Sequence, residues 1–355
     1  MRHQKSIATM SMAWAVALAC LVLPSLSFAG QKKASAPLYW GAQIGTQITG
    51  TQAPWDMRPV AGFEKVAGKG LSLVALNSSF ADCTSTPCTP YVFPTPAMEN
   101  ARLYGALPFL SWASTSSPES LNKPKLQLSD IIAGRYDGYL RQYATAAKAW
   151  GHPFFLRFNW EMNGFWFSWS EGVNGNRPGE YVAAWRHVHD IFASVGATNA
   201  TWVWCPNVDI TGELQNLKSL YPGNSYVDWT CLDGFNWGKR HGSPGWLSFD
   251  QIFRKTYDQV VKLAPSKPMI IGETASTNRG GDEANWIKDA LRGIRTSYHK
   301  IRGMIWFDVN DRGTHWPIET SSQKVRNAFR NGLRNPAYTP NRYGNLPFGP
   351  IQPPN

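Results

Sequence analysis

The chain has 355 residues, of which 43% are hydrophobic, 13% aromatic and 17% charged. This composition excludes an intrinsically disordered chain, which would be rich in charge and poor in aromatic residues. The length allows one large domain or two ordinary ones. The 17 Trp exceed ordinary usage, and flat aromatic rings bind sugars and bases as well as filling a core.

Residues 1–29 have the pattern of a secretory signal peptide. Arg2 and Lys5 give a positive start, residues 10–26 are mostly apolar, and small residues precede a cleavage site after Ala29. A segment of this kind is removed on export and is too short for a transmembrane helix. We therefore expect a secreted or periplasmic protein without a stable membrane anchor.

Removal of residues 1–29 takes away two basic residues and leaves a net charge of +9. A basic protein can attract nucleic acid, a membrane surface or an acidic polysaccharide. Such binding usually comes with a run of five or six like charges, and the basic residues here are scattered along the chain. The sequence therefore predicts a basic exported protein with no nucleic-acid partner.

Four Cys remain after residue 29, and an oxidising compartment favours disulfides. Cys83 and Cys88 flank a polar turn and are expected to form one. Cys205 and Cys231 are expected at opposite ends of neighbouring parallel strands, beyond the ~7 Å limit for a disulfide. The prediction is one disulfide and two buried thiols.

Short apolar runs alternate with helical patterns from residue 38 onward. Eight runs are expected to be strands: 38–44, 71–76, 107–112, 153–160, 200–205, 231–236, 268–272 and 302–307. Several are apolar almost throughout, which is typical of parallel strands buried on both faces. Eight strands alternating with helices predict a single-domain α/β fold, a (β/α)8 TIM barrel, over residues 30–335. A doubly wound open sheet is the alternative, but no Gly-rich phosphate loop follows a strand.

Helix boundaries and the end of the chain show local signals. Ser129 is expected to cap a helix that continues to Ala147, and Ser248 with Gln251 has the spacing of a capping box. Residues 336–355 contain six Pro. This tail is expected to be extended, either lying over the barrel or remaining loose.

Two glutamates directly follow or end buried strands of the predicted barrel. Glu161 follows the fourth run and Glu273 ends the seventh, and reactive groups of a (β/α)8 barrel lie where strands end. Burial among aromatic residues raises the pKa of a carboxyl group, as a general acid at neutral pH requires. One such residue alone is explained equally well as a helix cap or a partner of Arg157, but two on facing strands favour a catalytic function.

Paired carboxylates with aromatic rings are the groups that glycoside hydrolysis needs. One carboxyl protonates the leaving oxygen, and the other attacks the anomeric carbon in a retaining mechanism. The sequence does not give the distance between the carboxyl groups, but strands four and seven of such a barrel face each other across its mouth.

Three segments resemble glycoside hydrolase family 26, which belongs to a large clan of retaining (β/α)8 hydrolases. They are 160–166 (Trp-Glu-Met-Asn-Gly-Phe-Trp), 221–238 and 271–275 (Ile-Gly-Glu-Thr-Ala). The resemblance covers roughly residues 39–308. It implies that Glu161 is the acid/base and Glu273 the nucleophile. It also implies that Trp166 lies beside the acid and that Trp306 forms the aromatic floor under the sugar.

Two positions depart from the family pattern. Many members have His immediately before the acid/base, where this chain has Trp160. The family and clan usually present a Tyr that hydrogen-bonds the nucleophile, and this chain has Phe235 there. We therefore expect another group to hold Glu273, or a reduced rate of catalysis.

Further residues are candidates for substrate binding. Trp169 and Trp237 lie in loops after strands, where they are expected to stack on sugar faces, and Asn207 can bond sugar hydroxyls. Arg157 and Asn159 share strand parity with Glu161 and are expected to face the barrel interior. Arg157 is more simply an orienting charge than a substrate ligand. The His residues show no metal-ligand pattern, and nothing in the sequence requires a metal or cofactor.

The resemblance implies an endo-β-1,4-mannanase acting on polysaccharide by double displacement. We expect it to be exported, because of residues 1–29, and to be a monomer. A β-1,3-1,4-glucanase or β-1,3-xylanase would use the same residues. A carbohydrate-binding pseudoenzyme is the alternative that Phe235 keeps open, and the two retained glutamates argue against it. A nucleic-acid-binding or structural protein would need a clustered basic stripe.

Overall fold

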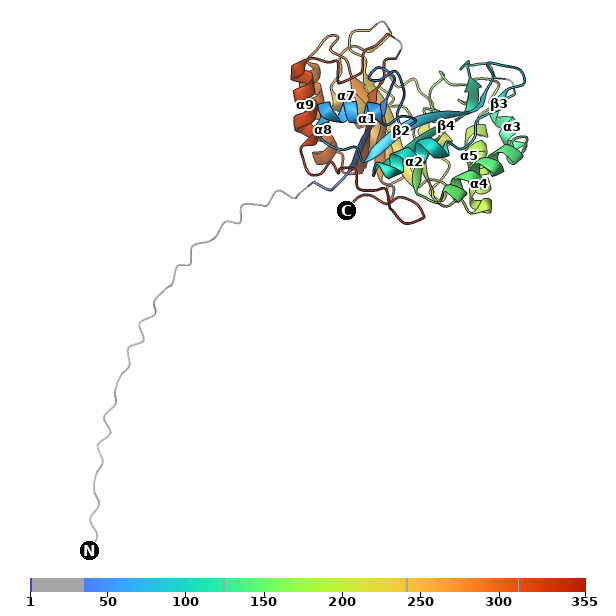
Figure 1. Ribbon diagram of the computed structural model, residues 1–355, viewed down its shortest axis with the longest axis horizontal. Coiled ribbons are helices and arrows are strands. Elements are labelled where there is room, and N and C mark those ends of the chain that lie inside the picture. Colours follow the sequence, from blue (N-terminus) through green and yellow to red (C-terminus); the bar gives the residue numbers. More distant parts are fainter. Residues whose placement is uncertain (2–34, 124, 241, 312) are drawn as a thin grey trace. The chain divides into compact units, whose positions relative to one another are not determined.

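The computed structural model describes Met1 and residues 35–123, 125–240, 242–311 and 313–355, so the predicted signal peptide lies outside the described residues except for Met1. Eight parallel strands form a barrel (Figure 1). They are β1 (Tyr39–Ile44), β2 (Leu73–Asp82), β4 (Leu107–Ser117), β5 (Phe154–Phe158), β6 (Ala200–Trp204), β7 (Trp229–Asn236), β8 (Met269–Ser276) and β9 (Ile301–Asp308). The short β3 (Thr89–Pro90) pairs antiparallel with the end of β2.

The sheet closes because β1 pairs with both β9 and β2. This closure confirms the (β/α)8 barrel and excludes the open doubly wound sheet, which would have two free edges. All eight expected strands are present. Four of them, β1, β5, β6 and β8, are buried along their whole length, since side chains on one face fill the barrel and those on the other face pack under helices.

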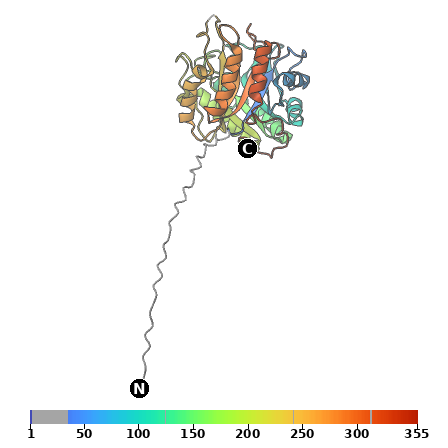
Figure 2. The ribbon, with the colours of Figure 1, turned by 90° about the vertical axis from the view of Figure 1, so that its left-hand side faces the viewer.

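Helices surround the barrel, as the two views in Figures 1 and 2 show. They are α1 (Arg58–Ala67), α2 (Thr95–Leu103), α3 (Leu128–Ile132), α4 (Asp137–Trp150), α5 (Glu180–Val195), α6 (Leu217–Leu220), α7 (Phe249–Leu263), α8 (Glu283–Thr296) and α9 (Gln323–Leu333). The capping box of Ser248 and Gln251 is confirmed at the start of α7. The expected cap at Ser129 is wrong, because Ser129 lies inside α3 and Gly134 adopts φ 75° before α4 begins.

Two disulfides are present, one more than expected. Cys83–Cys88 is confirmed. The prediction of buried thiols at Cys205 and Cys231 is wrong, because these residues form a second disulfide with Cα atoms 4.2 Å apart. Strand β7 begins at Trp229, two residues earlier than expected, and Trp204 pairs with Thr230. This register brings Cys205 level with Cys231.

The Pro-rich tail lies against the strand ends opposite the carboxylates. The Ile351 backbone N–H donates to Thr201 Oγ1 at 2.8 Å, and Trp229 Nε1 donates to the Ile351 carbonyl at 2.8 Å. The Arg302 guanidinium donates to the Pro354 carbonyl at 2.7 Å. Thr201, Trp229 and Arg302 lie at the beginnings of β6, β7 and β9, so the tail covers the amino-terminal end of the barrel.

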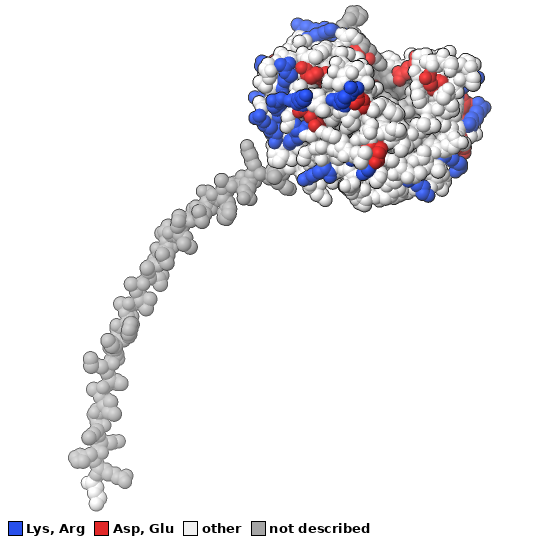
Figure 3. All heavy atoms as spheres, in the orientation of Figure 1, with Lys and Arg blue, Asp and Glu red and all other residues white. Residues whose placement is uncertain are grey.

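On the face in Figure 3, Lys and Arg side chains gather mainly over α1, α8 and α9, with acidic side chains among them. No helix within the described ranges is long and apolar enough to cross a membrane.

Candidate active site

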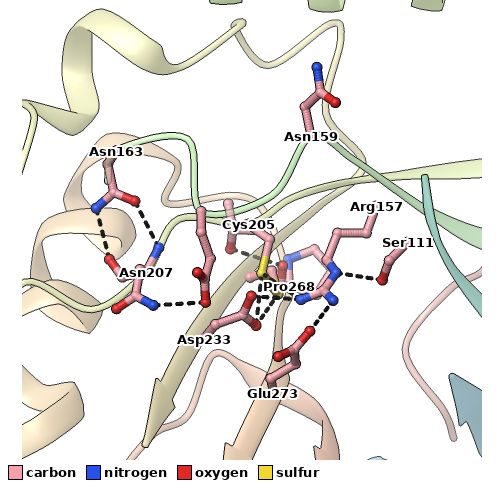
Figure 4. Close-up of a disulfide and its surroundings, with 12 residues drawn as sticks. Ser111, Arg157, Asn159, Asn163, Cys205, Asn207, Asp233, Pro268 and Glu273 are labelled. Carbon is pink, nitrogen blue, oxygen red and sulfur yellow. Dashed lines mark hydrogen bonds and ion pairs between the residues drawn. A yellow bond between two sulfur atoms is a disulfide. The ribbon is translucent and has the colours of Figure 1, made fainter. Parts of the chain in front are cut away.

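Glu161 lies in a sharp backbone turn just beyond β5. Asn159 and Glu161 have φ values of 43° and 52°, which are uncommon for residues other than glycine and cluster at functional sites. The Glu161 backbone N–H donates to the Cys205 carbonyl at 2.7 Å, so the turn is tied to the end of β6. Because of this turn, the side chains of Asn159 and Glu161 point in different directions. Asn159 hydrogen-bonds Ser114 of β4 and points away from Arg157 (Figure 4), which corrects the parity expected from the sequence.

Both oxygens of the Glu161 carboxylate accept hydrogen bonds. Trp166 Nε1 donates at 2.5 Å and Asn207 Nδ2 at 2.8 Å. Asn207 is itself held by Asn163, which accepts from its backbone N–H at 2.8 Å and donates to its carbonyl at 2.9 Å. Gly164 leaves the room that the Trp166 ring needs to lie beside it, because a Cβ on residue 164 would be 2.5 Å from the indole ring.

Glu273 belongs to β8, and its carboxylate accepts a hydrogen bond from the guanidinium of Arg157. Arg157 is almost fully buried and also donates to Asp233 at 2.6 Å and to Ser111 at 2.8 Å. Its guanidinium carbon lies 4.9 Å from the centre of the Trp160 ring. The buried cation is therefore fixed on several sides, and Figure 4 shows it between Asp233 and Glu273. The orienting role expected for Arg157 agrees with these contacts.

Gly272 makes room for this arrangement. A Cβ there would lie 2.6 Å from Cys231 Sγ, 2.7 Å from Asp233 Oδ1 and 3.0 Å from Arg157 Nη1. The first two approaches are closer than real Cβ atoms allow and the third is tight, so a larger residue before Glu273 would displace the ion pair. The space that the ion pair needs therefore explains why glycine precedes Glu273 in β8.

The carboxyl groups lie close together in a buried site. One oxygen from each of Glu161, Asp233 and Glu273 falls within 4.8 Å of the others. Burial raises the pKa of Glu161 to about 7, and the nearby charge of Glu273 adds to the shift, against the opposing hydrogen bonds of Trp166 and Asn207. Burial likewise raises the pKa of Asp233, which the Arg157 charge opposes. Glu161 therefore holds a proton near neutral pH.

The two glutamates line a cleft of about 290 Å³ at the carboxyl ends of the strands. Seven of the sequence-predicted residues line this cleft together with Phe307 and Trp316; they are Glu161, Glu273, Trp160, Trp166, Asn207, Phe235 and Trp237. Trp237 lines the same cleft and also a neighbouring hollow of about 340 Å³, which shares Trp166 and Asn207. The cleft therefore extends beyond the space around the carboxylates.

The structure places two predicted binding residues elsewhere. Trp169 is 1% exposed, stacks on Phe167 and donates to the Trp160 carbonyl at 2.7 Å. Trp306 is also 1% exposed and packs against Phe329 of α9. Neighbouring residues of a strand point to opposite faces, so Phe307 faces the cleft and Trp306 faces the helices.

Sequence reasoning missed Trp316 and Asn163. Trp316 lies in the loop after β9 and is 1% exposed, but unlike Trp169 and Trp306 it lines the cleft. Its ring centre lies 4.8 Å from that of Trp237 and 5.3 Å from that of Phe235. No periodic pattern marks a residue in such a loop. Asn163 stands inside the quoted Trp-Glu-Met-Asn-Gly segment, and that position beside the acid was the available signal.

Two groups of side chains in the described part of the chain have atoms close enough to hold a metal ion. One is Glu161, Asp233 and Glu273, where the Arg157 guanidinium already contacts Asp233 and Glu273. The other is Cys205, Cys231 and Asp233, in which the two sulfurs are bonded to each other. Arg157 is therefore the positively charged group that contacts Asp233 and Glu273.

A closed (β/α)8 barrel with two facing glutamates in an aromatic cleft is an arrangement of glycoside hydrolases. The model of glycosyl hydrolase family 26 matches residues 119–305. Endoglucanase H of Acetivibrio thermocellus is 32% identical over 322 residues, 89% of this chain. The chain belongs to glycosyl hydrolase family 26.

Other relatives share less sequence. A mannan endo-1,4-beta-mannosidase of Bacillus subtilis is 25% identical over 205 residues, 55% of this chain. The chain spans about a third of Endoglucanase H and about half of this mannosidase. The catalytic domain of a Bacillus sp. JAMB-750 endo-beta-1,4-mannanase has the same fold, with a TM-score of 0.63, 17% identity and coverage of 86% of this chain and 88% of that chain.

Proposed function

We propose that this protein is a glycoside hydrolase, a retaining endo-β-glycanase with Glu161 as acid/base and Glu273 as nucleophile. The observation that carries the proposal is the approach of their carboxylate oxygens within 4.8 Å across the cleft. Retaining enzymes place these groups about 5–5.5 Å apart, whereas inverting enzymes leave about 6.5–9.5 Å for a water molecule. The extended cleft suits binding along a polymer.

Each glutamate has surroundings that fit its step. Protonated Glu161 gives its proton to the leaving glycosidic oxygen while Glu273 attacks the anomeric carbon and forms a glycosyl ester. Ionised Glu161 then takes a proton from water, whose oxygen attacks the anomeric carbon and releases Glu273. Trp166 and Asn207 stabilise the ionised form of Glu161 during the second step, since both donate to it.

Arg157 serves the nucleophile where the family usually has a tyrosine hydroxyl. A buried guanidinium favours the ionised form of a neighbouring carboxylate, and this one also fixes the orientation of Glu273. Phe235 contributes an aromatic wall, with its ring centre 5.3 Å from that of Phe307. This arrangement argues against a pseudoenzyme, because a charged group replaces the missing hydroxyl.

Two β-glycan backbones are candidate substrates. The sequence resemblance proposes β-1,4-mannan. A β-glucan is favoured by a specific observation, since Endoglucanase H matches more of this chain at higher identity than the mannosidase does. Mannose and glucose differ only in the configuration at C2, so the contacts of this hydroxyl decide the preference.

A panel of polysaccharides tests the proposal. Wild type and Glu161→Ala are incubated with galactomannan, glucomannan, lichenan, xylans and an acidic exopolysaccharide, and reducing ends are measured. Release from galactomannan by wild type alone supports a mannanase, and release from lichenan alone supports the glucanase. Absence of release from every polymer, with retention of the protein on one of them, would instead indicate a carbohydrate-binding protein.

Export is a separate part of the proposal. Residues 1–29 support it by their charge and apolar pattern. Expression of the full chain in a bacterial host, with mass spectrometry of the exported protein, is expected to give a mature chain starting at Gly30. Retention of the intact chain inside the cell would contradict this.

A further inference from the structure

The Cys205–Cys231 disulfide lies beside the catalytic pair, yet no step of the proposed reaction uses it (Figure 4). Cys205 Sγ lies 3.2 Å from Asp233 Oδ1 and 3.9 Å from Arg157 Nη1. Cys231 Sγ lies 4.0 Å from the same Asp233 oxygen. Both cysteines are fully buried. The sulfurs therefore contact the ion pair that orients Glu273.

The same disulfide borders the backbone supports of both glutamates. The Cys205 carbonyl accepts the hydrogen bond from the Glu161 backbone N–H. Cys231 Sγ fills the space beside Gly272, the residue before Glu273, where a Cβ would lie 2.6 Å from the sulfur. The disulfide also crosses from the end of β6 to β7. It thus joins the element that holds Glu161 to the element that carries Asp233.

The oxidation state of the sulfurs changes what Asp233 can bind. A disulfide sulfur carries no proton, so it cannot donate to Asp233, whose charged partner is Arg157 at 2.6 Å. A thiol at the same place would be a donor, and a hydrogen bond to the ionised carboxylate would favour that form. Ionised Asp233 would then compete more strongly with Glu273 for the single guanidinium.

We propose that the Cys205–Cys231 disulfide is a positioning element of the reaction, fixing how Arg157 is shared between Asp233 and Glu273. This inference rests on the proposed function, because it assigns Glu273 as the nucleophile. Reduction by a dithiol breaks the S–S bond and forms two thiols, with two electrons and two protons supplied as the dithiol is oxidised to its own disulfide. The disulfide acts through Asp233 and Arg157, without touching substrate.

The pH profile is the readout that separates this role from simple stabilisation. The charged groups around Glu273 are Arg157 from β5, Asp233 from β7 and Glu161 from the turn after β5, and Asp311 lines the same cleft. Only Asp233 gains a donor when the sulfurs are reduced. The acidic limb of the kcat/KM profile is therefore expected at higher pH when hydrogen-bond donors replace the disulfide beside Asp233.

Three double variants test the proposal. Cys205→Ser/Cys231→Ser removes the bond and leaves hydroxyl donors beside Asp233. Cys205→Ala/Cys231→Ala removes both the bond and the donors. Cys83→Ser/Cys88→Ser is the matched control, because that disulfide closes the turn between β2 and β3 and has none of the contacts with Asp233 and Arg157 described above. Peptide mapping first establishes which disulfides wild type contains.

The serine pair is expected to lower kcat by about tenfold to a hundredfold, the cost of slight misplacement of reacting groups, with a raised acidic limb and little change in KM. The alanine pair is expected to lower kcat without moving the acidic limb. The control is expected to match wild type in both. Equal kcat and pH profile in the serine pair and the control would overturn the proposal, as would free thiols at Cys205 and Cys231 in wild type.

A measurement on the wild-type protein tests the proposal even if a variant does not fold. Activity is followed during incubation with dithiothreitol, and peptide mapping of each sample gives the fraction of each disulfide remaining. Activity is expected to fall in step with loss of the Cys205–Cys231 disulfide, and activity that survives this loss overturns the inference. Absence of hydrolysis in oxidised wild type would contradict the proposed function instead, so the two failures are distinguishable.

Discussion

The guanidinium of Arg157 donates a hydrogen bond to the carboxylate of Glu273 while it forms an ion pair with Asp233. One almost fully buried cation therefore serves two carboxylates, and its planar fork makes both contacts at once. The position where the family usually has a tyrosine contributes only the ring of Phe235.

Arg157→Lys tests this relationship. Lysine keeps the positive charge but loses the fork, so one of the two carboxylates loses its partner. We expect kcat to fall by about a hundredfold, with a smaller change in KM. Phe235→Tyr is the matched contrast and is expected to preserve or raise turnover. A fully active lysine variant would show that two-sided contact is not required, and a large loss in Phe235→Tyr would show that a hydroxyl is not tolerated there.

Glu273→Ala is expected to abolish hydrolysis and to leave polysaccharide binding intact. The substitution removes the group that forms the glycosyl ester, while the aromatic residues of the cleft remain. Reducing-end release and retention on the insoluble polymer measure the two properties separately. Hydrolysis clearly above background would contradict the assignment of the nucleophile.

The pKa of Glu161 predicts the alkaline limb of the pH–rate profile. The carboxyl is protonated below about pH 7, and the first step needs that proton, so activity is expected to fall as the pH rises above about 7. Asn207→Ala removes a hydrogen bond that lowers this pKa, so the alkaline limb is expected at higher pH. The pH dependence of kcat/KM in both proteins checks the direction, and a shift to lower pH would contradict it.

Trp316 and Trp306 are expected to respond differently to the same substitution. Trp316→Phe shrinks a nearly buried ring that borders the cleft and supports Phe235 and Trp237, and is expected to lower kcat/KM by about tenfold through slight misplacement of these rings. Trp306→Phe removes volume under α9 and is expected to lower the melting temperature with KM unchanged. Kinetics and thermal melts on both variants check this. A higher KM in Trp306→Phe would restore Trp306 as a binding residue.

The sequence predicts the barrel well because its signals are local. Each strand appears as an apolar run, and each helix has a periodic apolar face. Glu161 and Glu273 could be selected because a buried carboxyl group is costly unless it is paired or hydrogen-bonded, so two of them after buried strands indicate a functional site. The sequence predicted the wrong face of the strand for the Trp306 side chain, because a single-residue error at the end of a strand exchanges its two faces.

The remaining errors concern contacts between segments that are distant in the chain. The Cys205–Cys231 disulfide depends on the register of β6 against β7, which no local pattern specifies. The ion pair from Arg157 to Glu273 joins residues 116 positions apart, and Trp316 reaches the cleft through an irregular loop. The sequence indicates Arg157 as an orienting charge, and the structure shows that its partner is Glu273, which the family usually holds with a tyrosine.

The most direct test of the account is the anomeric configuration of the first product. Wild type is mixed with a soluble oligosaccharide of whichever backbone it cleaves, and proton NMR spectra are recorded before mutarotation proceeds. Double displacement by Glu161 and Glu273 predicts that the β-anomer of the new reducing end appears first. Initial appearance of the α-anomer would mean inversion by direct attack of water, and would contradict the assignment of Glu273 as a nucleophile.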